Sequence, residues 1–276
     1  MTEALKISFM MIILLGLMTT GVVEGQDVNV KIGLRDSIKS EILHGSSRIL
    51  IHLPDNYGTS NKSYPVMFRL NGNPAMMLET VSAVNRLALD QEIIPEMIIV
   101  SIETISGKDM WPVNTKYYPE PETLGANNFL SFIEKELIPY VEKRFRTNGD
   151  RILYGQSMTA VFTIYAFLAQ PKLFNSYIAC SGAFPDCEAF FKEFSLKSFQ
   201  QTDQFNGRKI FITNGLKDEL DPDGKMNQTL IDFSNSVKDK LGNRVLCKYL
   251  TYEDEGHVPF YSLYDGLKYI YKTSVK

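Results

Sequence analysis

The chain has 276 residues, of which 44% are hydrophobic, 12% aromatic and 22% charged, an ordinary globular composition with enough apolar material for one large core. Its formal net charge is -3, and acidic and basic residues are interspersed along it. This balance excludes the strongly basic surface of a nucleic-acid-binding protein, so we predict no nucleic-acid partner.

The N-terminal segment differs from the rest of the chain. Lys6 precedes 17 uncharged residues, 7–23, and small residues lie near Val23 and Gly25. A basic residue, an apolar stretch and a small-residue end are typical of a secretory signal peptide. The stretch is also short for a bilayer span of roughly 20 residues. We predict that residues 1–25 are cleaved, that the protein is periplasmic or secreted, and that it makes no stable membrane insertion afterwards. The alternative is an uncleaved anchor.

The mature chain, residues 26–276, alternates β-rich runs with segments of helical periodicity. Several of the runs are continuously apolar, which favours strands buried on both faces of a mostly parallel sheet. Because helices separate most strands after the first two, we predict one α/β domain with an eight-stranded sheet flanked by helices. The predicted strands are 28–34, 48–54, 64–72, 96–103, 151–157, 176–182, 209–215 and 245–253, and the predicted helices are 78–92, 124–145, 158–170, 224–241 and 260–274.

Ligands of open α/β sheets bind beyond the carboxyl ends of the strands, so residues that directly follow a strand are the ones to inspect. Four such positions carry polar residues suited to chemistry. They are the loop 71–73, Ser157, the acidic loop 214–224 and the loop 253–260.

Ser157 lies between an apolar strand-like run and a helix-like run, at the corner Gly155-Gln156-Ser157. This is the context of a nucleophile elbow, in which the serine projects above the sheet and the N–H of the next residue, Met158, stabilises an oxyanion. Thr159 stands where such a corner normally has glycine. The alternative is a serine that only caps the helix beginning at Met158.

A serine nucleophile of this type needs a base and an acid later in the chain. Of the three histidines, His44 and His52 precede the serine, and only His257 follows both it and the last strand. We therefore predict that His257 is the base. The acid should come from the loop after the penultimate strand, where Asp218 is the first choice and Glu219 the second.

The acidic loop has an alternative reading, in which its carboxylates bind solvent or calcium. Its sequence, DELDPDG, places oxygen ligands close together but lacks the spacing of an EF-hand loop. We predict no metal site and no organic cofactor.

The second oxyanion donor would come from the loop after the third predicted strand. The backbone N–H of Asn73 or of Gly72 could serve, whereas Pro74 has none. Trp111 and Tyr117 lie in the long loop after the fourth strand, and we predict that they stack on an aromatic acyl group or a sugar ring. The alternative is that they pack this loop onto the domain.

The three cysteines, Cys180, Cys187 and Cys247, fit no zinc spacing. Cys180 and Cys187 could form a disulfide with a short loop in an oxidising compartment, or remain buried thiols. Cys247 alternates with apolar neighbours and is predicted to be in the core.

From about residue 45 to 274 the chain resembles the esterase D-type esterases of the α/β-hydrolase superfamily. These include siderophore, feruloyl and acetylxylan esterases and S-formylglutathione hydrolases. The likeness is strongest in GANNFLSFIEKELIPYVEKRFRTNGDRILYGQSM (125–158), PKLFNSYIACSGAF (171–184) and GHVPFYSLYDGLKYIY (256–271). The segment GKDMWP (107–112) is similar to a family RxRDxxP segment but has Gly107 in place of the arginine.

The resemblance implies the α/β-hydrolase fold, with the family's nucleophile at Ser157, its base at His257 and its acid at Asp218. Two segments depart from the family pattern. Its GHSLGG is GQSMTA here, with Gln156 in place of histidine and Thr159 and Ala160 in place of both glycines. Its DG after the third strand is Asn71-Gly72.

Together these features predict an exported serine carboxylic-ester hydrolase acting on a small-molecule or glycan-linked ester through an acyl-enzyme intermediate. One alternative is a weak or inactive protein of the same fold that binds a glycan or a siderophore, which Thr159 and Ala160 would favour. Another is an acyltransferase that uses a hydroxyl group in place of water.

Overall fold

The computed structural model describes residues 30–103, 110–112, 125–184 and 187–272. The chain divides into two units, Met1–Lys31 and Ile32–Lys276, and the fold described below is that of the second unit. The predicted signal peptide, 1–25, and Tyr117 lie outside the described residues. The extent of the predicted mature domain, 26–276, stays a prediction.

An eight-stranded sheet with the order β1-β2-β4-β3-β5-β6-β7-β8 forms the centre of this unit. β2 runs antiparallel to both of its neighbours, and every other adjacent pair is parallel. The mostly parallel eight-stranded sheet predicted from the sequence is confirmed. The strands are β1 (Leu34–Ser40), β2 (Gly45–His52), β3 (Tyr64–Leu70), β4 (Ile98–Ile102), β5 (Thr147–Gln156), β6 (Ser176–Cys180), β7 (Arg208–Gly215) and β8 (Val245–Tyr252).

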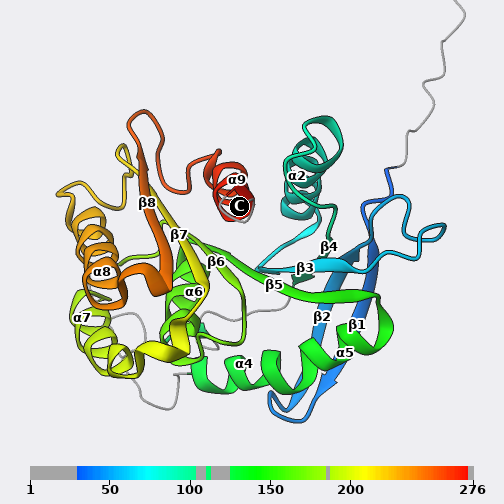
Figure 1. Cartoon of the computed structure of the whole chain (residues 1–276), viewed down its shortest axis with the longest axis horizontal. Coiled ribbons are helices and arrows are strands. Elements are labelled where there is room, and N and C mark those ends of the chain that lie inside the picture. Colours follow the sequence, from blue (N-terminus) through cyan, green and yellow to red (C-terminus); the bar gives the residue numbers. More distant parts are fainter. Residues whose placement is uncertain (1–29, 104–109, 113–124, 185–186, 273–276) are drawn as a thin grey trace, which may run out of the picture. The chain divides into compact units, whose positions relative to one another are not determined.

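Helices cover both faces of the sheet and enclose two apolar clusters (Figure 1). One face carries α2 (Pro74–Asn85) and α9 (Ser262–Lys272). The opposite face carries α4 (Ala126–Phe132), α5 (Ile138–Arg144), α6 (Met158–Ala169), α7 (Cys187–Ser198) and α8 (Lys225–Leu241). Short π-helical turns (Arg86–Asp90 and Ile133–Leu137) and 3₁₀ turns (Phe199–Phe205 and Gly242–Arg244) extend these helices.

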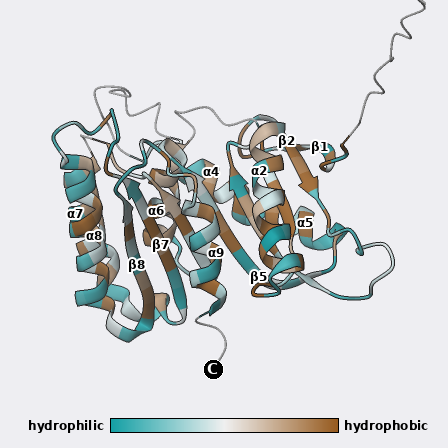
Figure 2. Cartoon of the chain, turned by 90° about the horizontal axis from the view of Figure 1, so that it is seen from above, coloured by the Kyte–Doolittle hydropathy of each residue, from teal (hydrophilic) through white to brown (hydrophobic). Residues whose placement is uncertain are grey.

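The burial of the strands follows from this two-sided cover. Every residue of β3, β4 and β6 is buried, which explains why these strands are continuously apolar in sequence. The hydropathy colouring in Figure 2 shows the inner strands mostly brown and a mixture of both colours on α8. Strand β1, at the edge, exposes most of its side chains.

Helix α6 is the most enclosed helix near the middle of the sheet. Ten of its twelve residues are buried, in keeping with the apolar run MTAVFTIYAFLA. A helix that is apolar all round must be covered on all sides, here by the sheet and the neighbouring helices. The residue from which α6 begins is therefore held rigidly at the end of β5.

Two sequence predictions were wrong. The first strand is Leu34–Ser40 rather than 28–34, because this edge strand pairs with β2 through a short hairpin and only two of its residues are buried, which leaves little apolar signal. No helix was predicted at 187–198, where α7 forms. Its buried positions, Cys187, Phe191 and Ser195, have helical spacing, but a serine among them weakens the apolar pattern.

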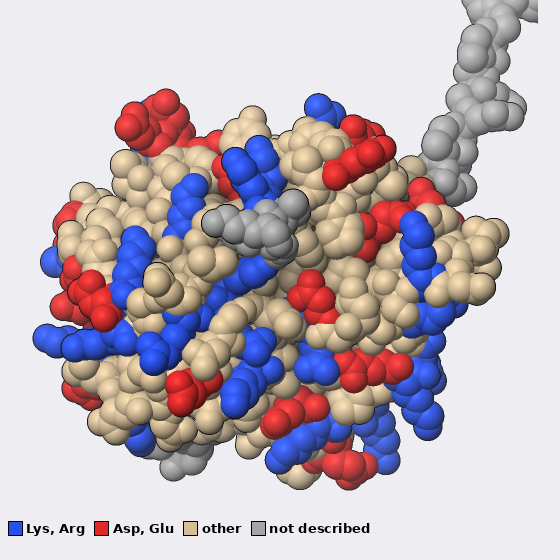
Figure 3. Space-filling view, in the orientation of Figure 1, with Lys and Arg blue, Asp and Glu red and all other residues tan. Residues whose placement is uncertain are grey.

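Cys180 and Cys187 are both buried as thiols rather than joined in a disulfide, and Cys247 is partly buried. In the part of the chain that the structure describes, no helix is both long and apolar enough to cross a membrane. On the face seen in Figure 3, lysine and arginine side chains are interspersed with aspartate and glutamate, as the composition indicates.

Candidate active site

Four loops meet at the carboxyl edge of the parallel strands. Asn71–Asn73 follow β3, Ser157 follows β5, Asp218 lies in the loop after β7, and His257 lies in the loop after β8. This is the edge at which open α/β sheets place their ligands.

Ser157 has the backbone angles φ 55° and ψ -127°, a strained conformation for a residue with a side chain. Its N–H donates to the carbonyl oxygen of Cys180 at 2.8 Å, and its own carbonyl accepts from Ala160 N–H at 2.8 Å. The Ser157 side chain makes no capping hydrogen bond to α6. The alternative that it serves as a helix cap is therefore wrong, and its hydroxyl points elsewhere.

The hydroxyl of Ser157 is hydrogen-bonded to His257. Oγ lies 2.7 Å from His257 Nε2, and His257 Nδ1 lies 2.6 Å from Asp218 Oδ2. Because a carboxylate only accepts hydrogen bonds, Nδ1 carries the proton toward Asp218, and Nε2 of the neutral ring accepts from the serine. The structure thus brings together the three side chains that the sequence analysis selected.

Asp218 is held deep in its loop, with its side chain 1% exposed, whereas the His257 side chain is 22% exposed. The second carboxylate oxygen of Asp218 accepts from Leu220 N–H at 2.9 Å. Glu219, the second choice for the acid, is exposed.

The other carboxylates of this loop have structural partners. Asp221 accepts from the N–H groups of Met226 and Asn227 in the first turn of α8. Asp223 forms an ion pair with Lys225 at 2.7 Å. Among the described residues, no group of three or more His, Cys, Asp or Glu side chains could hold a metal ion.

Backbone contacts join the acid loop to the histidine loop. Leu216 N–H donates to Tyr252 O and Lys217 N–H donates to Glu255 O, both at 2.9 Å. Val258, directly after His257, has a positive φ of 63°, and its N–H donates to Ser181 Oγ at 3.2 Å. These contacts fix the distance between Asp218 and the imidazole.

Thr159 and Ala160, which depart from the family pattern, fit the corner. The Thr159 hydroxyl accepts from Gln156 N–H at 2.7 Å and donates to Gln156 O at 2.8 Å, so its side chain ties the two sides of the turn together. Close approach is possible because residue 155 is glycine: a Cβ there would lie 2.3 Å from Thr159 O. Ala160 is fully buried against Gly182.

Cys180 is a second potential nucleophile close to Ser157. It is fully buried, and this burial raises the pKa of its thiol above the ordinary value. The thiolate is the nucleophilic form of cysteine, so Cys180 stays protonated and does not compete with the serine.

The two candidates for the second oxyanion donor differ in their hydrogen bonds. Gly72 N–H donates to Ile102 O at 3.3 Å. Asn73 begins α2, where its Oδ1 accepts from Met76 N–H at 3.0 Å, and no hydrogen bond in the described part of the chain engages its own N–H. This difference favours Asn73. Met158 is the first residue of α6.

Trp111 is only 2% exposed and packs edge-to-face on Phe184, with 5.6 Å between the ring centroids. The Phe184 ring in turn lies 6.4 Å from the His257 ring. Trp111 therefore forms the layer behind Phe184, as expected if it packs its loop onto the domain. Its predicted contact with substrate stays a prediction.

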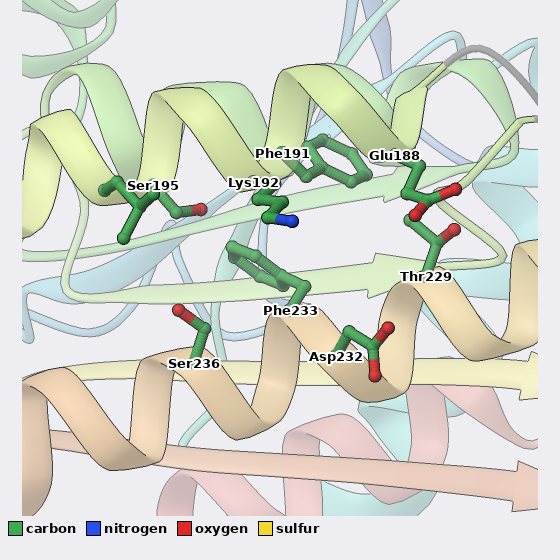
Figure 4. A pocket seen from close by; sticks show the side chains of 9 residues that line it. Glu188, Phe191, Lys192, Ser195, Thr229, Asp232, Phe233 and Ser236 are labelled. Atoms are coloured by element: carbon green, nitrogen blue, oxygen red, sulfur yellow. The ribbon is translucent and has the colours of Figure 1, made fainter.

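Two of the cavities in the described part of the structure bear on the search for a binding site. One, of about 360 Å³, lies between α7 and α8 and contains none of the predicted site residues (Figure 4). The other is a groove of about 740 Å³ between α2 and the start of α9. It includes Ala75, two residues after Asn73, and Phe260 and Tyr261, shortly after His257.

Phe260 and Tyr261 are 67% and 53% exposed, and the sequence analysis did not select them. The signal that could have found them is their position three and four residues after the histidine, in a loop that must face the same edge of the sheet as His257.

A model of the Esterase family, described as "Putative esterase", matches residues 40–236. Ferri-bacillibactin esterase BesA of Bacillus subtilis is 29% identical over 136 residues, which are 43% of this chain and 47% of that protein. The chain spans about half the length of the curated relatives it matches.

Solved structures show the same fold. An IroE-like serine hydrolase from Shewanella oneidensis superposes with a TM-score of 0.76 at 23% identity, covering 87% of this chain and 80% of the other. Siderophore hydrolase EstA from Aspergillus nidulans gives 0.75 at 17% identity, covering 92% and 100%. The fold is thus the α/β-hydrolase fold, as the resemblance implied. With its family model matched over 40–236, this chain belongs to the Esterase family.

Proposed function

We propose that the protein is an exported carboxylic-ester hydrolase that acts through Ser157, His257 and Asp218 and an acyl-enzyme intermediate. The observation that carries the proposal is the continuous chain of hydrogen bonds from Ser157 Oγ through the His257 ring to Asp218, at 2.7 and 2.6 Å. Family membership supports the reaction class.

In the first step, Ser157 Oγ attacks the acyl carbonyl carbon while His257 Nε2 takes the hydroxyl proton. Asp218 holds the imidazole in the required tautomer and stabilises its charged form. The carbonyl oxygen becomes an oxyanion, to which the N–H groups of Met158 and Asn73 donate.

The tetrahedral intermediate then collapses. The bond to the alcohol breaks, His257 returns its proton to the departing oxygen, and the acyl group remains on Ser157. A water molecule then attacks this ester while the same ring takes its proton. The bond to Ser157 Oγ breaks, the ring returns the proton to Oγ, and the acid is released. A hydroxyl compound in place of water would complete an acyl transfer, so the two outcomes share every residue up to this point.

We propose a small-molecule ester of the siderophore type as substrate, because the proteins that this chain is similar to include the ferri-bacillibactin esterase BesA and the siderophore hydrolase EstA. The groove between α2 and α9 would hold its apolar or aromatic part beside Phe260. On this proposal Phe260→Ala raises KM for an aryl ester several-fold and leaves KM for an acetyl ester unchanged. An aryl-ester KM that is unchanged in the variant, or a KM that rises equally for both esters, would reject the groove as the binding site.

A fluorophosphonate probe, which reacts with activated serines, tests the mechanism. We expect one label on the folded mature protein and none in Ser157→Ala. A folded wild-type protein that takes no label would favour the alternative of a binding protein for a glycan or a siderophore.

Export with cleavage after Gly25 is part of the proposal. Expression of the full chain with fractionation, followed by N-terminal sequencing, should give a mature protein that begins at Gln26. A protein that keeps residues 1–25 and remains with the membrane fraction would support the anchor instead.

A further inference from the structure

Arg69, next to last in β3, is an arginine buried in the centre of the domain. Its side chain is 1% exposed, its Nη2 donates to Gln156 Oε1 at 2.9 Å, and its guanidinium carbon lies 4.9 Å from the centre of the Tyr154 ring. Gln156 directly precedes Ser157, and its amide nitrogen donates to the Tyr154 hydroxyl at 2.5 Å. Arg69 therefore contacts the residue that leads into the nucleophile.

Arg69 also lies directly beneath the loop that presents Asn73. A Cβ at Gly72 would lie 3.0 Å from Arg69 Cδ and 3.1 Å from its Nε, so only glycine allows this approach without displacing the arginine. Ser101 Oγ donates to Gly72 O at 2.8 Å and holds the same loop from β4. The arginine thus touches both segments from which the oxyanion donors would come.

Within the part of the chain that the structure describes, two of the three nitrogens of the Arg69 guanidinium lack a hydrogen-bond acceptor, and the Tyr154 ring is the other partner of its charge. These nitrogens, Nε and Nη1, are buried, and no carboxylate among the described residues forms an ion pair with the guanidinium. Arg151, at the other end of β5, has its Nη2 2.7 Å from Glu142. A buried and unpaired charge is strongly destabilising, and such departures from the rules of folding concentrate at functional sites.

We propose that Arg69 is a positioning residue for the oxyanion site. Arg69 holds Gln156 and the 71–73 loop, and its buried positive charge favours the negatively charged tetrahedral intermediate. This inference rests on the proposed function. A cation in a dry environment interacts strongly with a charge that develops close to it, and it needs no rearrangement when the reaction occurs.

Arg69→Met tests this inference, because methionine keeps most of the side-chain length and removes the charge. We expect kcat for a p-nitrophenyl ester to fall about 10- to 100-fold, less than the roughly 10²- to 10³-fold loss on removal of an oxyanion donor itself, because Arg69 acts from behind the donors. KM should stay within about twofold of wild type. The urea midpoint of unfolding should stay the same or rise, because an uncompensated charge is removed. Arg69→Lys, which keeps the charge, should retain more of kcat than Arg69→Met.

Two further variants keep the test independent of any folding defect. Gln156→Met removes the acceptor and leaves Arg69 in place, and we expect a smaller loss of kcat, non-additive with Arg69→Met because the two residues act as a unit. The control is Arg151→Met, in the neighbouring strand β5, where the arginine is paired with Glu142. This variant should lower the urea midpoint and leave kcat unchanged.

A trifluoromethyl ketone provides a readout that does not depend on turnover, since its adduct with Ser157 carries the same oxyanion. Its affinity should weaken in Arg69→Met by the same factor as kcat. An unchanged kcat, or a kcat that falls only in step with the urea midpoint, would overturn the inference. If instead the wild-type protein neither hydrolyses esters nor takes a fluorophosphonate label, it is the proposed function that fails.

Discussion

Asp218 and Arg69 are buried charged side chains on two sides of the same serine, and their surroundings differ. Each carboxylate oxygen of Asp218 has a hydrogen-bond donor, His257 Nδ1 at 2.6 Å and Leu220 N–H at 2.9 Å. The Arg69 guanidinium donates to Gln156, while its Nε and Nη1 have no acceptor among the described residues. Both oxygens of Asp218 are thus hydrogen-bonded, whereas Arg69 has, within the described part of the chain, a hydrogen bond at only one of its three nitrogens and the Tyr154 ring beside it.

This difference separates two ways of using a buried charge. A fully hydrogen-bonded carboxylate fixes the orientation and the proton of its partner, so its removal disables one specific interaction. A partly unpaired cation lowers the stability of the folded state and acts through its field, so its removal should lower activity without loss of stability.

The largest effect is expected at Asp218, whose carboxylate is fully hydrogen-bonded. Asp218→Asn keeps the shape of the side chain but favours the wrong tautomer of His257, and activity should fall about 10⁴-fold, as in other serine triads. Ester hydrolysis by the purified variant measures this. Glu219→Gln is the matched control at the adjacent exposed position and should retain full activity; an equal loss in both variants would contradict the assignment of Asp218.

An intermediate effect is expected at the corner itself. Thr159→Val keeps the branched shape but removes the hydroxyl that accepts from Gln156 N–H and donates to Gln156 O. A buried backbone group left without its partner costs about 1–3 kcal/mol, so both the free energy of unfolding and kcat should fall. Urea unfolding and ester kinetics measure the two effects.

Thr159→Ser keeps the hydroxyl and serves as the control, with stability and kcat close to wild type. Because the family motif has glycine at this position, it suggests that Thr159→Gly should raise activity. We expect activity to fall instead, since the Thr159 side chain ties the turn together. A rise in activity with Thr159→Gly would show that the branched side chain constrains the corner.

The smallest effect comes from a buried ionisable group away from the site. His52 in β2 is 8% exposed, and burial lowers the pKa of its imidazole below the ordinary 6.5. Below about pH 6.5, His52 binds a proton in the unfolded chain, whereas in the folded protein it does so only at lower pH. The free energy of unfolding is therefore at its full value above this pH and declines as the pH falls.

Thermal unfolding between pH 7.5 and about pH 5 measures this decline, set against the His52→Asn variant, in which it should be shallower. The difference should be smaller than the loss in Thr159→Val. Parallel curves for the two proteins would show that His52 titrates alike in the folded and unfolded states.

The fold and the site residues could be predicted from the sequence where the informative pattern lies within one short segment. The buried strands β3, β4 and β6 are mostly apolar, and this pattern predicted that they lie inside the sheet. The order of Ser157, Asp218 and His257, each after a strand, was sufficient to select the three side chains that the structure brings within hydrogen-bond distance. Their catalytic role stays a prediction.

What could not be predicted depends on contacts between distant segments. Arg69 and Gln156 are 87 positions apart, and nothing in β3 alone shows that the arginine is buried beneath the loop at Gly72. The local motif showed Thr159 only as a departure from glycine, because the motif does not show that the threonine hydroxyl bonds back to Gln156. Strand β1 was misplaced because an exposed edge strand has little apolar pattern.

The central claim, that Ser157 forms an acyl-enzyme, is tested most directly by mass spectrometry of the protein quenched during turnover of p-nitrophenyl acetate. Asp218→Asn should be included, because slow deacylation would let the intermediate accumulate. We predict the mass of one added acetyl group on the peptide that contains Ser157, and no such adduct in Ser157→Ala. Ester hydrolysis that persists in Ser157→Ala, or an acetyl group found on another residue in its place, would contradict this claim.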